Sequence, residues 1–296
     1  MKKRLFSIIL AVAVVLSISA AYTPETRAAV TDGWNAASSN IEWLVDTSGF
    51  GTLYIRRANQ NSNAHISNTS IGGAPWNKHN TQVRFIDIED GVSEIGDAAF
   101  ANFSKVTHVE IKGNVTRIGK DAFRGCSLLE GFLAGGGLQE FLNPASAIKS
   151  KTFSGLATID DRAFFNCYEL KSLCIPDVTV LGSSNNSSAE VFTGCRSLWD
   201  IRTPHGGTDL RNRVLMDNHV LVQMNNANPP VPFRVIKSPV NLAARVGAGN
   251  EYMLSSSITR IDIEAFSYLR GRGQQVTGAS WDSAYSANIT NEISGI

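Results

Sequence analysis

The stretch IGDAAFANFSKVTHVEIKGNVTRIGKDAFRGCSLLE, residues 95–130, contains one complete sequence unit and the beginning of a second. The apolar residues Ile95 and Phe100 recur 23 residues later as Ile118 and Phe123. Two apolar columns with the same offset define a period, and periods of about 20–29 residues are typical of stacked solenoid repeats. The stretch therefore predicts a β-rich repeat solenoid with units of about 23 residues.

Each half of the unit recurs elsewhere in the chain. The first half returns as IGKDAF (118–123), IDDRAF (159–164), AEVF (189–192) and IDIEAF (261–266). The second half, VTHVEI (106–111), returns as LEGFLA (129–134), LKSLCI (170–175) and LWDIRT (198–203), and VRFIDI (83–88) precedes them. In VTHVEI apolar and polar residues alternate, which is typical of a strand with one buried face.

The apolar columns predict the core. One repeat cannot bury its own apolar face, so stacked neighbours must complete it. Gly96 and Gly119 are expected at turns with positive φ, which glycine reaches without a Cβ clash. The residues predicted to form the repeat core are Ile95, Phe100, Ile118, Phe123, Cys126, Ile159, Phe164, Cys167, Phe192, Cys195 and Phe266.

The pattern IGxxAFxxC followed by LxxLxI resembles the BspA-type leucine-rich repeats of bacterial surface and secreted proteins. The resemblance covers residues 83–203, and again about 251–269. It implies a leucine-rich repeat solenoid, a role in adhesion or host interaction, and no catalytic residues. The motif identifies the class of repeat but says little about the ligand.

The N-terminal part differs in composition from the repeats. Residues 1–28 join a basic start to an apolar run, as in a secretory signal peptide, so we expect export and no stable membrane span after cleavage. Residues 31–82 contain two predicted strands, 41–45 and 51–57, and are expected to form an N-terminal β cap over the open end of the solenoid. Trp76 is expected to cover the core next to Phe100, with sugar stacking as the alternative.

The repeats are irregular towards the C-terminus. Insertions are expected at about 135–154 and at 183–188, either as recognition loops or as tolerated surface loops. Residues 204–250 are expected to be a degenerate hairpin and repeat region, with a hairpin over 213–224. The last recognisable repeat is 251–270, and 271–296 form a polar tail.

The sequence offers little for catalysis or for metal binding. Three of the four cysteines, Cys126, Cys167 and Cys195, share one apolar column, which favours buried thiols over disulfides, whereas Cys174 is expected to be accessible. No Cys/His cluster has the spacing of a zinc site and no nucleophile or phosphate-binding motif is present. We therefore expect no cofactor, no metal and no enzymatic activity, and the formal net charge of +1 argues against nucleic acid as a partner.

The outward positions of the strands are the remaining candidate site. Aligning the strands gives three columns that are expected to lie on the exposed face of the sheet. Phe85 and Trp199 are aromatic residues that core packing does not require there. The hypothesis is a recognition strip for a protein or glycan, made of Arg84, Phe85, Asp87, His108, Glu110, Lys171, Trp199, Asp200 and Arg202.

Together these features predict a noncatalytic secreted or cell-surface leucine-rich repeat protein. Its expected role is adhesion, through binding of an extracellular protein or glycan by the exposed sheet face. The alternatives are a module that binds surface polysaccharide and a structural spacer segment of a larger envelope protein.

Overall fold

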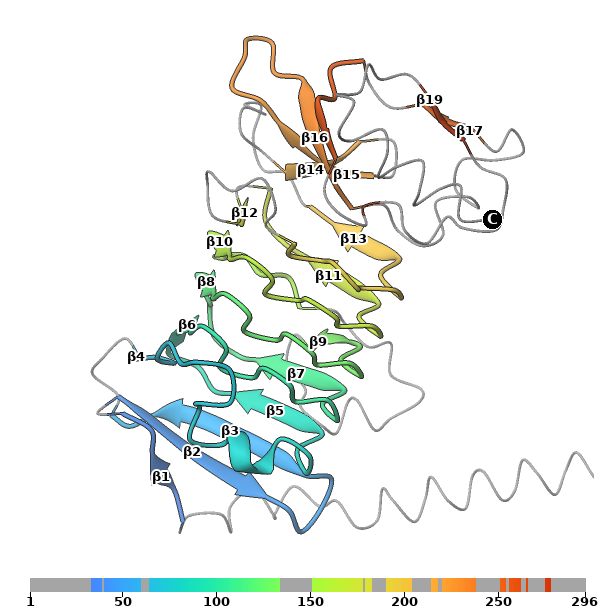
Figure 1. Ribbon diagram of the computed structural model, residues 1–296. Coiled ribbons are helices and arrows are strands. Elements are labelled where there is room, and N and C mark those ends of the chain that lie inside the picture. The colour runs from blue at the N-terminus through green and yellow to red at the C-terminus, as the bar shows by residue number, and fades with distance from the viewer. Residues whose placement is uncertain are drawn as a thin grey trace, which may run out of the picture.

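The computed structural model shows a β-solenoid of about four turns (Figure 1). It describes residues 33–38, 40–59, 64–133, 151–177, 179–182, 190–203, 214–217, 220–237, 251–253, 256–261, 265 and 275–277. The region predicted as a signal peptide, the insertion at 183–188 and Phe266 lie outside these residues, as do most of 135–154 and most of the tail. Among the described residues, no helix has the length and apolar character needed to cross a bilayer.

A wide parallel sheet forms one side of the solenoid (Figure 1). The sheet begins with an antiparallel hairpin, and β3 then pairs in parallel with β5. Six strands are continuous, and β11 and β13 pair with each other further along the same side. The strands are β1 (Asn35–Ala36), β2 (Ile41–Asp46), β3 (Thr52–Arg57), β5 (Phe85–Ile88), β7 (His108–Ile111), β9 (Gly131–Leu133), β11 (Ser172–Cys174) and β13 (Asp200–Arg202).

A narrow parallel sheet forms the opposite side of the solenoid, in the order β12-β10-β8-β6-β4 (Figure 1). Its register matches the predicted repeat column, because Ile95 pairs with Ile118 and Ile118 with Ile159. The strands are β4 (Ala64–His65), β6 (Val92–Ile95), β8 (Arg117–Ile118), β10 (Thr158–Ile159) and β12 (Val180–Leu181). Each coil therefore crosses the molecule once and returns, and the core lies between the two sheets.

A ladder of phenylalanine rings fills that core. Phe100, Phe123, Phe164 and Phe192 stack in sequence, with ring centroids 5.3, 5.8 and 5.9 Å apart. Replacing such a buried phenylalanine with alanine typically costs about 3–5 kcal/mol. Apart from Phe266, every residue predicted for the repeat core is buried.

Two tryptophan rings pack at the N-terminal end of this ladder. The Trp76 ring lies 5.8 Å from Phe100, and its Nε1 donates a hydrogen bond of 2.8 Å to the Ala99 carbonyl. Trp43 of β2 packs edge-on against Trp76. A short 3-10 helix, η2 (Asn77–His79), follows. Since only 2% of Trp76 is exposed, its ring has no free face for a sugar.

The role of glycine at the turns differs from the predicted one. Positive φ occurs at Ala98, Asp121, Arg162 and Glu190, and again four residues later in each coil at Asn102, Gly125, Asn166 and Gly194. Gly96 and Gly119 are not among the positive-φ residues, so the predicted reason for them is wrong. They are needed for space, because a Cβ at Gly96 would lie 2.3 Å from the Ile66 and Ser67 carbonyl oxygens.

Asparagine and glycine alternate at the second of these turn positions. A Cβ added to Gly125 would lie 2.5 Å from Oδ1 of Asn102 in the preceding coil. A Cβ added to Gly194 would lie 2.3 Å from Oδ1 of Asn166 and 2.9 Å from its Cα. Each asparagine therefore occupies the space that a Cβ would need at the glycine of the next coil, and the glycine allows the two coils to approach closely.

The cysteines are free and buried. The Sγ atoms of Cys126, Cys167 and Cys195 donate to the carbonyls of Phe100, Phe123 and Phe164, at 3.1–3.2 Å. Burial raises the pKa of the Cys126 thiol to about 12. The prediction that Cys174 is accessible is wrong, because β11 lies beside residues 152–153 and only 4% of Cys174 is exposed.

The C-terminal strands continue the layered arrangement. The predicted hairpin is present as β14 (Val214–Asp217) and β15 (Val220–Met224), and β15 also pairs with β16 (Pro232–Lys237). From β15 and β16, Leu221 and Ile236 extend the solenoid core. In addition, β16 pairs in parallel with β18 (Arg260–Ile261), and β17 (Glu251–Met253) with β19 (Gln275–Thr277). The segment predicted to be a polar tail, 271–296, thus contains the strand β19.

Candidate binding face

The strands align across the wide sheet as the sequence columns predict. Asp87 pairs with Glu110, Phe85 with His108, and Ser172 with Asp200. A third column lies just before the strands, and its backbone amides and carbonyls are hydrogen bonded from coil to coil at 2.7–3.0 Å. We call this column the strand-start row, and its members are Arg84, Thr107, Glu130, Lys171 and Trp199.

The half of the face formed by β5, β7 and β9 is closed, contrary to the prediction. Phe85 and Glu110 are each only 1% exposed, and Asp87 and His108 are also buried. Strand alternation indicates the side of the sheet on which a residue lies, but it does not indicate whether that side faces solvent. These four residues of the predicted strip are therefore not a solvent-exposed binding surface.

The predicted insertion begins and ends within this closed half. β9 ends at Leu133, and the Lys151 amide donates to the Phe132 carbonyl at 2.8 Å. Thr152 then bridges Cys174 of β11. The chain therefore leaves and rejoins the sheet at one strand position, between β7 and β11.

Lysines near this point compensate the buried carboxylates. Lys112 Nζ lies 2.6 Å from Asp87 Oδ1 and 2.8 Å from Oδ2. Burial lowers the pKa of Lys151, although the charges of Glu110 and Asp90 oppose that shift. Both lysines were absent from the predicted strip. Lys112 could have been found from the alternation, since it lies two residues after Glu110 and hence on the same side of the strand.

His108 is held neutral in the closed half. Burial lowers the pKa of its imidazole to about 4, because a charged ring loses hydration there. The nearby Glu130 carboxylate partly opposes this shift, and Lys171 adds to it. His108 is therefore a buried neutral group near neutral pH.

The opposite end of the face, at β13 and the strand-start residues before it, is open. Trp199 is 45% exposed, and Arg202 is also exposed. Asp200 is half-buried and pairs with Arg202 at 3.2 Å. In the strand-start row, Lys171 pairs with the half-exposed Glu130, and Arg84 is exposed at the far end. Of the predicted strip, Arg84, Lys171, Trp199, Asp200 and Arg202 thus remain available to a partner.

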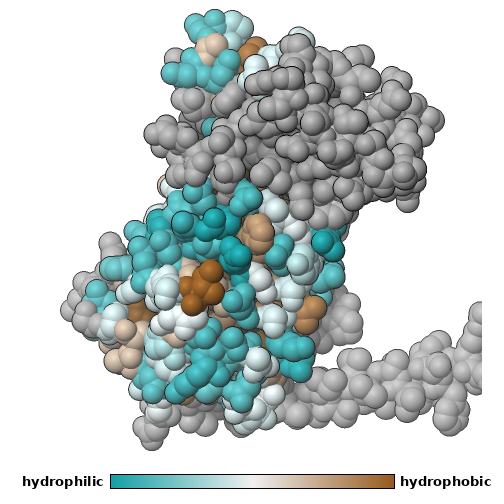
Figure 2. Space-filling view, in the orientation of Figure 1, coloured by the Kyte–Doolittle hydropathy of each residue, from teal (hydrophilic) through white to brown (hydrophobic). Residues whose placement is uncertain are grey.

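Apolar residues do not gather elsewhere on the visible surface of the repeats. Figure 2 shows a mainly hydrophilic surface with separate hydrophobic spots over the described coils. Large exposed apolar side chains of the described residues are Ile71, Leu128, Val180, Trp199 and Val231. Scattered apolar residues are ordinary on soluble surfaces. Trp199 differs from the others because it is aromatic and lies among charged residues of the strand-start row.

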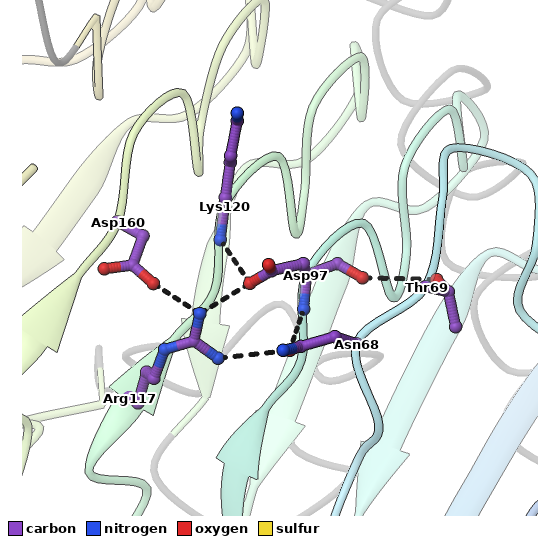
Figure 3. Close-up of polar contacts among 6 residues, drawn as sticks. All are labelled: Asn68, Thr69, Asp97, Arg117, Lys120 and Asp160. Carbon is purple, nitrogen blue, oxygen red and sulfur yellow. Dashed lines mark hydrogen bonds and ion pairs between the residues drawn. The ribbon is translucent and has the colours of Figure 1, made fainter. Parts of the chain in front are cut away.

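A polar cluster on the narrow-sheet side has a structural role (Figure 3). Arg117 Nη2 lies 2.5 Å from both Asp97 and Asp160, and Nη1 donates to Asn68 Oδ1 at 3.2 Å. Burial alone would lower the pKa of Arg117, but the hydrogen bonds and charges of Asp97 and Asp160 raise it. The Asp97 carboxylate also accepts from the Lys120 amide. This cluster joins successive coils through groups that already have partners.

The described residues offer no arrangement for metal binding. Among them, no three histidine, cysteine or carboxylate side chains are grouped so that they could hold an ion. The buried carboxylates of the closed half lie beside lysines, which is an unfavourable setting for a cation. The exposed side chains of the open end are suited to noncovalent contact with a partner.

The repeat pattern matches a known family. The model of the BspA type leucine rich repeat region matches six copies, at residues 69–187 and 138–238, which together span more than half of the chain. This chain belongs to the BspA-type leucine-rich repeat family. No curated protein matches its sequence.

Solved structures of bacterial leucine-rich repeat proteins are similar to this BspA-type chain. A leucine-rich repeat protein from Eubacterium ventriosum is 17% identical with a TM-score of 0.49, and the match covers 83% of this chain and 60% of that protein. A leucine rich cell surface protein from Faecalibacterium prausnitzii is 18% identical with a TM-score of 0.37, over 86% and 56%. The pneumococcal vaccine antigen PcpA is 12% identical with a TM-score of 0.37, over 84% and 64%. This chain thus spans less than two thirds of each of these proteins.

Proposed function

We propose that this chain is a noncatalytic, exported repeat protein that binds an extracellular protein through the open end of its wide sheet. Its activity would be adhesion to a host, bacterial or matrix protein. The basic and apolar N-terminal sequence supports export. Membership of the BspA-type family supports a binding role for the repeats.

The observation that carries this proposal is the exposure of Trp199. Its side chain is 45% exposed, whereas the aromatic residue in the closed half, Phe85, is 1% exposed. Tryptophan and arginine are enriched among the residues that dominate binding energy in protein interfaces. Trp199 and Arg202 are both on the open end, and the adjacent charges of Lys171 and Asp200 can form a polar rim.

The test is binding of the purified mature chain to a panel of extracellular-matrix proteins and of glycans. We expect saturable binding to a protein, and loss of at least about tenfold in affinity for Trp199→Ala with Arg202→Ala, as for interface anchors. Val180→Ala is the matched control, because Val180 is 44% exposed but lies on the narrow sheet. It should leave binding unchanged.

Other results would redirect the assignment. Retention on glycans alone that depends on Trp199 would identify a polysaccharide-binding module. Equal binding by the double variant and by the parent would exclude the open end as the site. Absence of saturable binding to any member of the panel would favour a structural spacer.

A further inference from the structure

The contact between Lys112 and Asp87 joins two neighbouring coils in the closed half. Asp87 is in β5, and Lys112 follows β7 directly. The two side chains are 22% and 7% exposed, and Nζ lies 2.6 and 2.8 Å from the two carboxylate oxygens. The backbone around them is fixed, since the Lys112 amide donates to the Ile88 carbonyl at 3.0 Å. An amine is thus held against a carboxyl group by the fold.

A second carboxyl group lies beside this pair. Glu110 is 1% exposed and pairs in register with Asp87. Side chains at paired positions of neighbouring strands are about 5 Å apart on one face, and Lys112 shares that face because it follows Glu110 by two residues. Phe85, two residues before Asp87, supplies a buried apolar neighbour on the same face. The site therefore contains the Lys112 amine, two carboxyl groups and restricted access to water, and a second amine, that of Lys151, lies close enough to Glu110 to interact with its charge.

This combination favours condensation to an amide. Removing a charged pair from water costs free energy that a neutral amide does not incur. Holding the two reactants in contact replaces a bimolecular encounter by an intramolecular one, with effective molarities of up to about 10⁵–10⁸ M for well-oriented groups. A nearby carboxyl group can relay the proton, which the reaction requires because the amine must be neutral and the leaving oxygen protonated.

We propose that Lys112 and Asp87 condense spontaneously in the folded protein to form an amide cross-link between the coils of β5 and β7. The Lys112 ammonium gives a proton to Glu110, and the neutral amine attacks Cγ of Asp87. A C–N bond forms and a C–O bond breaks. Protons from the amine, relayed by Glu110, leave with the carboxyl oxygen as one water molecule. The charges of the ammonium and carboxylate cancel, and no oxidant, metal or other reactant is required.

An exposed ion pair in the same sheet provides a matched comparison. Lys171 contacts Glu130 across neighbouring coils, but the two side chains are 46% and 39% exposed. Hydration of both ions and free access of water disfavour condensation there. The proposal therefore distinguishes two lysine–carboxylate contacts within one face by their burial.

The test is intact-mass spectrometry of the full purified chain after incubation at neutral pH, followed by proteolytic mapping. We expect most molecules to lack the mass of one water, and a branched peptide to join the segments that contain Asp87 and Lys112. Lys112→Arg keeps the positive charge but removes the amine, so it should retain the full mass. Glu110→Gln should slow the water loss at least tenfold, whereas Lys171→Arg should have no effect on it.

Two outcomes would overturn the proposal. One is a folded parent protein, verified by circular dichroism, that keeps the full mass and yields both peptides separately. The other is water loss that persists in Lys112→Arg, since this would place the modification elsewhere. If Lys112→Arg does not fold, the peptide map of the parent decides alone. These results do not depend on whether the open end binds a partner.

Discussion

The closed half and the open end of the wide sheet repeat the same parallel strand register but differ in which side chains they expose to solvent. Phe85 of β5 and Trp199, just before β13, are both large aromatic residues, yet they are 1% and 45% exposed. The register is regular within each region, as the pairing of Phe85 with His108 and of Ser172 with Asp200 shows. The position of Phe85 in the repeat is occupied by the half-buried Asp200 in the coil of β13, so equivalent positions in a repeat array can differ in their exposure to solvent.

The charged pairs of the two regions differ in burial in the same way as the aromatic residues do. In the closed half, Lys112 contacts both oxygens of a largely buried carboxylate, Asp87. At the open end, Asp200 pairs with Arg202 at 3.2 Å, with about half of the arginine side chain exposed. Buried charged groups are costly unless they are paired, whereas exposed pairs contribute about 0–1 kcal/mol. We therefore expect substitutions to lower stability more in the closed half than at the open end.

The largest effect is expected from truncating the two aromatic residues separately. Phe85→Ala should lower the free energy of unfolding by about 3–5 kcal/mol, because it empties a buried site. Trp199→Ala should lower it by less than about 1 kcal/mol, because much of the ring is already in water. Urea denaturation of both variants and the parent measures the difference. Equal losses would show that the two regions do not differ in the way described.

A smaller effect is expected from the titration of His108. Its pKa in the folded protein is about 4, below the ordinary value of 6.5, because burial disfavours the charged ring. Between these values the unfolded chain binds a proton that the folded protein does not, so stability falls as the pH falls. The contribution of His108 to stability should decrease by about 2 kcal/mol from about pH 7 to about pH 5.

The measurement is the free energy of unfolding at both pH values for the parent and for His108→Gln. Subtracting the variant removes the titration of other groups that the substitution does not perturb. The parent should lose more stability than the variant on acidification. If the free energy of unfolding changes equally with pH in the two proteins, the His108 imidazole is hydrated, like the exposed side chains of the open end.

The smallest effect is expected at the exposed pair in the strand-start row. Lys171→Ala should change the free energy of unfolding by less than about 0.5 kcal/mol, because the Lys171–Glu130 pair is largely hydrated. Thermal and urea denaturation can set this limit. A loss of more than about 2 kcal/mol would mean that Lys171 supports the fold, as residues of the closed half do.

The sequence predicted the framework of this molecule but not the accessibility of its surface. The recurrence of Ile95 and Phe100 predicted the strand register and the stacked rings, because a repeat of fixed length places equivalent residues in one column. Burial of Phe85 could not be predicted in this way, since it depends on contacts that lie outside the period. The same limit applies to Cys174, which lies beside Thr152 where the chain rejoins the sheet.

The sequence pattern also failed to predict the backbone conformation at the turns. Gly96 and Gly119 are explained by close approach of neighbouring coils, whereas positive φ occurs at residues such as Ala98 and Asp121. The recurrence of asparagine or glycine at Asn102, Gly125, Asn166 and Gly194 was the available signal for a second turn. The strand columns did not include Lys112, because it lies one residue after the end of β7.

The alternation of Asn102, Gly125, Asn166 and Gly194 has a consequence for how such an array can grow. A coil that carries asparagine at this turn fits beneath a coil that carries glycine, since a Cβ at Gly194 would lie 2.9 Å from the Asn166 Cα. Duplication of a single asparagine coil would place two asparagines in succession and force the backbones apart. Duplication of two adjacent coils would preserve the fit. A pair of adjacent repeats is therefore a unit whose duplication would lengthen this solenoid without a clash at the turn.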